Sequence, residues 1–212
     1  MWTFRSRWNP QRPRGFPADG GKGQVMRIGV LAVQGAFAEH IAALKRLGAD
    51  AFEIRQLADI SQNFDGLVLP GGESTVMNKL LHDLGLFQPL KAKIEAGLPV
   101  LGTCAGMILL AKSVEGGIPC FGTLDMTVKR NAYGRQLGSF VCKEQFAGQE
   151  ITMRFIRAPY VESVENSTEI LAEHGGKIIA VQQGNQLATA FHPELTEDTA
   201  VYDLFFKSLA KS

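Results

Sequence analysis

Three short apolar runs in the first half of the chain, RIGVLAV, DGLVLP and PVLGT, are each followed by a glycine-containing turn and then by helical spacing. Nearly continuous apolar runs of this length are typical of strands that are buried on both faces. AFEIR supplies one more such strand, and residues 86–96 one of the intervening helices. Strands that alternate with helices form a parallel sheet covered on both faces. The sequence therefore predicts an α/β protein whose ligand site lies at the carboxyl ends of the strands.

The second half of the chain has a different rhythm after about residue 120. Its apolar segments are shorter and follow each other closely: TLDMTV, GSFVC, ITMRFIR, KIIAVQQ and QLATAFHP, the last two joined by a tight turn at Gly184-Asn185. An amphipathic helix containing Val201 and Phe205 closes the chain. We therefore expect a smaller antiparallel portion beside the mostly parallel central sheet.

Composition excludes several classes of protein. The 212 residues are 45% hydrophobic and 20% charged, which suits one globular domain. The three cysteines lack metal-site spacing and disulfide density, and no apolar stretch is long enough to span a bilayer. The formal charge is +1, and outside residues 1–25 acids exceed bases by three, which argues against a nucleic-acid surface. We expect a cytoplasmic protein with no membrane or nucleic-acid partner, no metal and no cofactor.

Residues 1–25 differ from the rest of the chain. They carry five basic residues and one acid, with three prolines and four glycines, and contain no apolar core of a secretory signal. We expect a disordered leader that takes no part in the fold, and a single domain over residues 26–212.

The sequence GTCAG at 102–106 places Cys104 between two glycines, where a strand turns into a helix. This is the cysteine form of a nucleophile elbow, whose sharp turn requires small neighbours. The N-terminus of the following helix favours a thiolate and can receive an oxyanion. Cys104 is therefore the candidate nucleophile, whereas Cys120 and Cys142 have no base near them in sequence and are expected to be core or surface thiols.

A nucleophilic thiol needs a base, and His192 in FHPEL is the candidate. Pro193 keeps the preceding residue extended, so Glu194 can share a side with His192 and orient its imidazole. We expect His40, His82 and His174 to lie at the surface or to be half-buried. The sequence thus predicts a Cys, His, Glu triad.

PGGEST at 70–75 ends another strand at the same sheet edge. Gly71 and Gly72 let the backbone approach a ligand, and their amides could form an oxyanion hole with the amide of Ala105. Gln34, at the end of the first strand, faces either this pocket or a partner protein.

Together these motifs resemble the triad-type (class I) glutamine amidotransferases, in which HPE follows a GxCxG elbow. LAVQGAFAEH, LPGGEST, GTCAGMILLA, RNAYGRQ, FIRAP and FHPELTED are similar to the glutaminase subunit of pyridoxal 5'-phosphate synthase, over nearly all of residues 26–212. The resemblance implies the three-layer, flavodoxin-like fold of that class. It also implies a hetero-oligomer with a synthase subunit, which uses ammonia released from L-glutamine for vitamin B6 synthesis.

The resemblance further implies that Cys104 attacks the glutamine amide, His192 protonates the departing ammonia and Glu194 orients His192. The residues implied to contact glutamine are Gly72, Glu73, Ser74, Arg130, Ile156 and Arg157. A zwitterion needs an acid for its ammonium and a base for its carboxylate, and Glu73 and an arginine supply both. The residues leave open which arginine binds the carboxylate.

Two alternative functions remain at this point. The chain could serve another pathway, such as imidazole glycerol phosphate synthesis, although RNAYGRQ and FIRAP count against it. It could also be a free-standing cysteine hydrolase acting on peptides or γ-glutamyl chains, which would share the elbow and triad. A binding module that has lost activity is disfavoured by the intact triad.

Overall fold

The computed structural model describes residues 25–130 and 139–210. The predicted leader, apart from its last residue, and most of the RNAYGRQ motif lie outside the described residues.

The helices and strands follow one another in the order that the sequence predicts for its first half. The elements are β1 (Arg27–Leu31), α1 (Phe37–Arg46), β2 (Asp50–Ile54), α2 (Leu57–Ile60), β3 (Gly66–Leu69), α3 (Ser74–Asp83), α4 (Phe87–Glu95), β4 (Val100–Thr103), α5 (Ala105–Leu110), β5 (Ala111–Glu115), β6 (Leu124–Lys129), β7 (Ser139–Phe146), β8 (Gln149–Ile156), β9 (Tyr160–Val164), β10 (Glu169–His174), β11 (Lys177–Gln183), β12 (Gln186–Thr189), the 3-10 turn η1 (Pro193–Leu195) and α6 (Ala200–Leu209).

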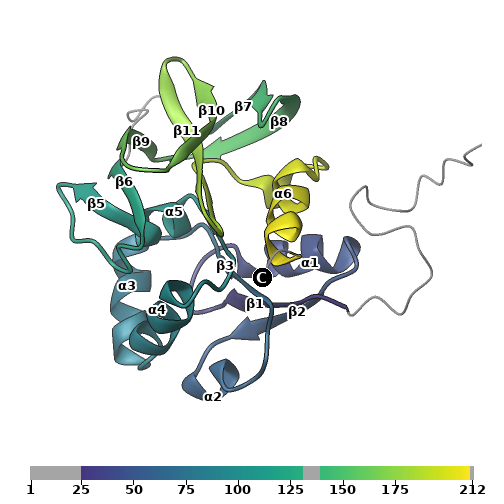
Figure 1. Ribbon diagram of the computed structural model, residues 1–212, viewed down its shortest axis with the longest axis vertical. Coiled ribbons are helices and arrows are strands. Elements are labelled where there is room, and N and C mark those ends of the chain that lie inside the picture. The colour runs from purple at the N-terminus through teal and green to yellow at the C-terminus, as the bar shows by residue number, and fades with distance from the viewer. Residues whose placement is uncertain (1–24, 131–138, 211–212) are drawn as a thin grey trace, which may run out of the picture.

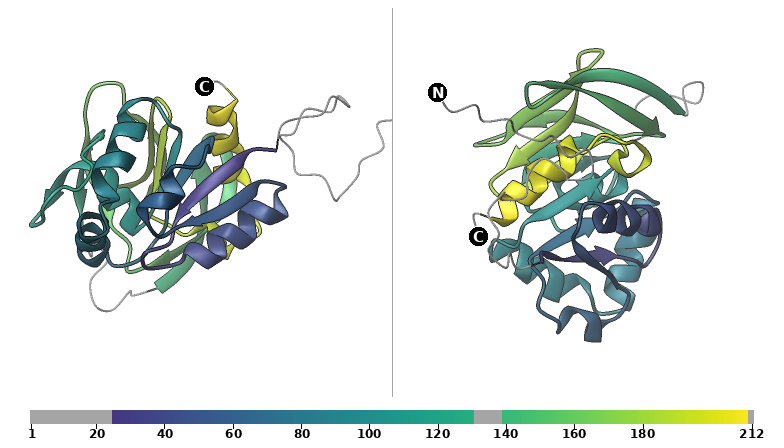
Figure 2. Two further views of the ribbon diagram at one scale, coloured as in Figure 1. Left: turned by 90° about the horizontal axis from the view of Figure 1, so that it is seen from below. Right: turned by 90° about the vertical axis from the view of Figure 1, so that its right-hand side faces the viewer.

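The large sheet has the strand order β2-β1-β3-β4-β12-β11-β9-β6-β5, with β10 paired to β11. The pairs from β2 to β12 are parallel, and β12, β11, β9 and β6 then pair antiparallel. A separate antiparallel pair, β7-β8, lies at the opposite end of the molecule from α2 (Figures 1 and 2). The predicted α/β architecture, mostly parallel with a smaller antiparallel portion, is therefore confirmed.

Helices cover both faces of the parallel part of the sheet. In Figure 1, α1 and α6 lie on one side of the strands, and α3 and α4 lie on the other. Strands β3 and β4 are buried along their whole length, as the apolar runs predict. The apolar residues form one continuous core across these layers, so the parallel strands are held rigidly and their carboxyl ends can position a site.

Three strands were not predicted from the sequence: β5 (AKSVE), β9 (YVESV) and β10 (EILAEH). Each carries exposed polar residues, because the part of the sheet beyond β12 is only partly covered. Their apolar signal is weak for that reason. Among the described residues, no helix is long and apolar enough to cross a membrane.

Candidate active site

Cys104 lies on a sharp turn between β4 and α5. Its backbone has φ 49° and ψ −101°, a conformation that is uncommon for a residue with a side chain. The amide of Cys104 donates a hydrogen bond of 2.8 Å to the carbonyl of Thr189, at the end of the neighbouring strand β12. Strain held by its surroundings is typical of functional residues. The turn has the geometry of the predicted nucleophile elbow.

The two glycines around Cys104 are required by packing. A Cβ on Gly106 would lie 1.9 Å from the carbonyl oxygen of Leu69 in β3, and a Cβ on Gly102 would lie 2.8 Å from the backbone of Gly106. The short helix α5 therefore rests directly on the backbone of the sheet. Only glycine at these positions allows this close approach.

His192 lies beside Cys104, three residues beyond the end of β12. Its amide donates a hydrogen bond of 2.8 Å to the carbonyl of Arg154 in β8, which fixes the backbone at this position. A Cβ on Gly71 would lie 2.5 Å from Cε1 of His192 and 3.4 Å from Cβ of Cys104. The carboxyl ends of β3, β4 and β12 thus bring Gly71, Cys104 and His192 together.

Glu194 holds the imidazole of His192. Its Oε1 lies 2.7 Å from Nδ1 of His192, and both side chains are buried. Nδ1 therefore carries the hydrogen, because the carboxylate can only accept, and Nε2 is left for chemistry. The three predicted triad residues are brought together, in chain order, at one site.

The electrostatics of the triad favour a protonated imidazole. Burial opposes the charge on His192, but interactions with Cys104 and Glu194 outweigh burial and raise its pKa to about 10. Nε2 of His192 is buried and makes no well-aligned hydrogen bond to any residue that the structure describes. The sulfur of Cys104 is nevertheless near enough to stabilise the charge on the imidazole. Burial likewise opposes the charge on Glu194, yet the two neighbouring histidines lower the pKa of its carboxyl group. His192 can therefore hold a proton at neutral pH.

A cavity of about 530 Å³ opens onto the triad. The residues predicted to contact glutamine or to form the oxyanion hole all line this cavity, as do Cys104 and His192. Its walls consist of Gln34, Gly35, Ala36, Gly71, Gly72, Glu73, Ser74, Cys104, Ala105, Ile108, Arg130, Ile156, Arg157, Pro159 and His192. Glu194 lies behind His192 and does not reach the cavity. The volume suits a small molecule.

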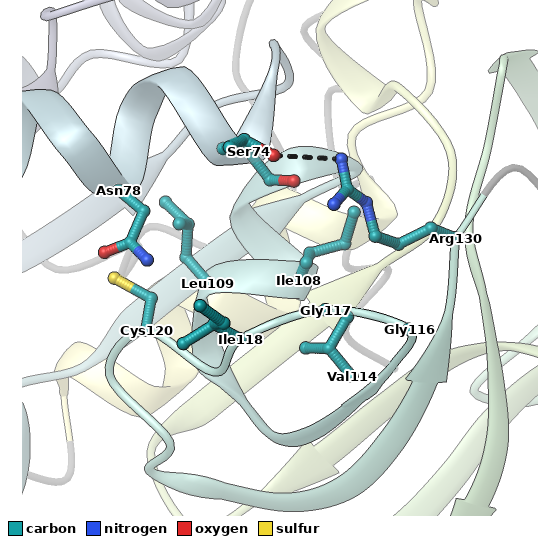
Figure 3. Close-up of a pocket in the computed structure, with 11 residues that line it drawn as sticks. Ser74, Asn78, Ile108, Leu109, Val114, Gly116, Gly117, Ile118, Cys120 and Arg130 are labelled. Atoms are coloured by element: carbon teal, nitrogen blue, oxygen red, sulfur yellow. Dashed lines mark hydrogen bonds between the residues drawn. The ribbon is translucent and has the colours of Figure 1, made fainter.

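Glu73 and Arg130 form an ion pair at the mouth of the cavity. Nη2 of Arg130 lies 3.1 Å from Oε1 of Glu73 and 3.2 Å from Oγ1 of Thr75. Figure 3 shows Arg130 extending towards the N-terminus of α3, where Ser74 lies. Both residues line a smaller adjoining pocket. Oε2 of Glu73 also caps α3 by accepting a hydrogen bond from the amide of Val76 at 2.8 Å. The acid is thus fixed by the helix and paired with a base.

Gln34 and Gly71 tie the loop after β1 to the loop after β3. Oε1 of Gln34 accepts a hydrogen bond of 2.8 Å from the amide of Glu73, and the carbonyl of Gly71 accepts one of 2.9 Å from the amide of Ala36. The peptide bond is trans, so the amide of Gly72 points away from Ala36. Gln34 lines the cavity.

Ile156, the last residue of β8, and Arg157 also line the cavity. The thiol of Cys104 donates a weak hydrogen bond of 3.9 Å to the carbonyl of Ile156. Arg157 has φ 43°, the left-handed region that few residues with side chains adopt, and its side chain is exposed at the rim. The end of β8 therefore approaches the nucleophile directly.

The prediction that His40 is exposed or half-buried is wrong. Its side chain is completely buried, with Nε2 3.0 Å from Oγ1 of Thr103 and 3.3 Å from Oε2 of Glu194. Its Nδ1 lies 2.9 Å from the hydroxyl of Tyr202 in α6. The helical spacing of Phe37 and Leu44 places His40 on the apolar face of α1, and this signal could have revealed a buried polar residue.

The remaining histidines and cysteines lie as expected. His82 is exposed and His174 is half-buried, where it pairs with Glu144 at 2.7 Å. Cys120 and Cys142 are half-buried free thiols. Burial raises the pKa of Cys120 to about 12 and also raises that of Cys142. Both are poor nucleophiles at neutral pH.

Comparison with known proteins agrees with this geometry. Residues 30–211 match the SNO glutamine amidotransferase family. The chain is 58% identical to "Pyridoxal 5'-phosphate synthase subunit PdxT" of Methanocorpusculum labreanum, over 87% of this chain and 98% of that protein. It is 52% identical to the protein of the same name from Desulfitobacterium hafniense strain DCB-2, over 87% of this chain and 94% of that protein.

Solved structures give the same result. A crystal structure described as a glutamine amidotransferase superposes with a TM-score of 0.81 at 41% identity, over 86% of this chain and 98% of that one. A protein described as PurLQS from Thermotoga maritima, 14% identical, shares the fold with a TM-score of 0.61, over 89% of this chain and 99% of that one. The fold expected from the resemblance is therefore confirmed, and the chain belongs to the SNO glutamine amidotransferase family.

Proposed function

We propose that this protein hydrolyses L-glutamine to glutamate and ammonia, and that a separate synthase subunit uses the ammonia to make pyridoxal 5'-phosphate. The observation that carries the proposal is a nucleophile elbow at Cys104 beside a buried His192–Glu194 pair, at the base of a small-molecule cavity. A thiol, a base and a group that orients the base are the requirements of nucleophilic catalysis.

In this mechanism the thiolate of Cys104 attacks the side-chain carbonyl carbon of glutamine. The resulting oxyanion accepts hydrogen bonds from the amides of Ala105 and Gly72, and His192 gives its proton to the amide nitrogen. The C–N bond breaks, ammonia leaves, and a γ-glutamyl thioester forms on Cys104. Water then attacks the thioester, its proton returns to His192, and the thiolate departs with release of glutamate.

The ion pair of Glu73 and Arg130 suits the other end of glutamine. The α-ammonium and α-carboxylate of an amino acid are attached to the same carbon, so they require an acid and a base that are themselves neighbours. Glu73 and Arg130 lie 3.1 Å apart at the mouth of the cavity, with the triad at its base. We infer that Glu73 binds the ammonium and Arg130 the carboxylate, while Gly72, Ser74, Ile156 and Arg157 shape the cavity.

The proposed partner follows from the relatives. Those at 58% and 52% identity are named as a subunit of pyridoxal 5'-phosphate synthase, and this chain covers 98% and 94% of their lengths. A subunit requires a second chain, so we propose a hetero-oligomer formed by the domain over residues 26–212. This support favours pyridoxal phosphate synthesis over imidazole glycerol phosphate synthesis.

The test is glutamine hydrolysis by the purified full chain, alone and with the synthase subunit. We expect glutamate release that Cys104→Ala abolishes, and pyridoxal 5'-phosphate formation from glutamine only when both subunits are present. Glutamine analogues with an electrophilic side chain should label Cys104. Cleavage of peptides or γ-glutamyl chains at rates that exceed glutamine hydrolysis would instead establish a free-standing cysteine hydrolase.

A further inference from the structure

Glu194 has a second buried contact that the triad does not use. Its Oε1 is hydrogen-bonded to His192. Its Oε2 is buried as well, but accepts no well-aligned hydrogen bond from the described residues. A buried carboxylate oxygen that lacks a donor is costly. Nε2 of His40 lies 3.3 Å from this oxygen, and both side chains are fully buried. His40 is therefore placed to act on Glu194.

The contacts of His40 select one tautomer. If Nδ1 carried the hydrogen, Nε2 would present a lone pair to the carboxylate at 3.3 Å, and two buried acceptors would face each other. If the hydroxyl of Tyr202 donates to Nδ1 at 2.9 Å, Nε2 carries the hydrogen instead. That hydrogen lies between two acceptors. Oγ1 of Thr103 is 3.0 Å from Nε2, and Oε2 of Glu194 is 3.3 Å from it. Only the second arrangement directs a donor, rather than a lone pair, towards Oε2 of Glu194.

The charge states agree with this arrangement. Burial lowers the pKa of His40, so its ring is neutral and acts on Glu194 as an N–H dipole rather than as a cation. Burial and the nearby Glu194 raise the pKa of Tyr202 well above its ordinary value, so its hydroxyl keeps the hydrogen that it donates. Glu194 and Glu39 oppose neutralisation of His40, whereas the nearby His192 favours it, and burial is the largest of these effects.

We propose that His40 is a positioning residue of the glutaminase site, which holds the carboxylate of Glu194 in place through Nε2–H in the tautomer that Tyr202 selects. The proposal rests on the triad roles given above. Three elements remote in sequence, α1, η1 and α6, meet at this point. Their packing would then determine the orientation of His192, and through it the proton supplied to the leaving ammonia.

The experiment compares His40→Leu with His40→Gln in the full chain with its synthase subunit. Leucine removes the donor, whereas the amide nitrogen of glutamine reaches about as far as Nε2 and restores it. We expect His40→Leu to lower kcat about 10- to 100-fold with KM changed less than about threefold, because a hydrogen bond to a charged group is lost. His40→Gln should recover most of this loss.

Two further variants separate positioning from general loss of a buried network. Tyr202→Phe removes the group that selects the tautomer and should lower kcat about 3- to 10-fold. Thr103→Val removes the competing acceptor but leaves Nε2–H directed to Glu194, so kcat should stay within about threefold. Each variant should remain folded, with Tm lowered by only a few degrees. Equal losses in Thr103→Val and Tyr202→Phe would overturn the proposal, as would His40→Leu with wild-type kcat.

A second readout needs no glutamine. Alkylation of Cys104 by iodoacetamide reports on the thiolate that His192 supports, so His40→Leu should slow it at pH 7 and His40→Gln should restore it. If the variants show this pattern of alkylation but the wild-type protein hydrolyses no glutamine, the proposed function fails while the role of His40 stands. Identical alkylation rates in folded Leu and Gln variants would refute that role.

Discussion

Gly106→Ala tests whether the close contact between α5 and the sheet positions the nucleophile. The new Cβ would lie 1.9 Å from the carbonyl oxygen of Leu69, 2.7 Å from its carbonyl carbon and 2.9 Å from its Cβ. Such contacts are normally longer than 3.0 Å, so α5 must move by about 1 Å or more. Strand β3 cannot yield instead, because it is paired on both sides.

The displacement affects activity more than stability. Overpacking of this kind costs about 1–3 kcal/mol, and each kcal/mol lowers Tm by roughly 2–4 °C in a domain of this size. Cys104 immediately precedes α5 and would move with it, and a misplacement of about 1 Å can cost on the order of 100-fold in kcat. We therefore expect a folded protein with kcat reduced about 100-fold.

The assay measures glutamate release beside thermal unfolding, with Gly117→Ala as the matched control. A Cβ on Gly117 would have only side-chain atoms as its nearest neighbours, Cγ1 of Val114 at 2.9 Å and Cδ of Arg130 at 3.8 Å, so it requires a smaller shift than a Cβ on Gly106. The control should keep Tm within a few degrees and kcat within about threefold. Gly106→Ala with wild-type Tm and wild-type kcat would show that this close contact does not position Cys104.

Three other outcomes follow from the site. Glu194→Gln should lower kcat by at least about 100-fold with little change in KM, measured by steady-state kinetics, because the amide no longer stabilises a protonated His192. An electrophilic glutamine analogue should label Cys104 and spare Cys120 and Cys142, whose raised pKa values keep them protonated; peptide mass spectrometry checks this. Because the pKa of His192 is raised from 6.5 to about 10, its stabilising contribution is complete below pH 6.5 and is lost as pH rises towards 10. Urea unfolding should therefore show wild type losing stability relative to His192→Asn across that range, and a constant difference would contradict the shift.

The sequence predicted the parallel half of the fold because strands buried on both faces are apolar throughout. RIGVL, GLVL and VLGT all became central strands, and the turns after them form the site. The partly exposed strands β5, β9 and β10 escaped prediction because adjacent polar residues, such as Lys112-Ser113 and Glu162-Ser163, interrupt the alternation that marks a half-buried strand.

The candidate site was predictable where chemistry is local in sequence. The elbow at Cys104 and the pair His192 and Glu194 are short motifs, and the structure brings them together. His40 and Tyr202 are 162 residues apart and meet only because α1 and α6 share one face of the sheet. No local pattern encodes that contact, although a histidine on the apolar face of a helix indicates that some partner exists.

The proposed mechanism requires that glutamine is cleaved through a thioester on Cys104. Rapid acid quenching of the complex during glutamine turnover, followed by peptide mass spectrometry, tests it most directly. We expect a γ-glutamyl adduct on the peptide that contains Cys104, formed before glutamate appears and absent from Cys104→Ala, which should also release no glutamate. Glutamate release by Cys104→Ala at the wild-type rate, or an adduct on Cys120 or Cys142 in place of Cys104, would contradict this mechanism.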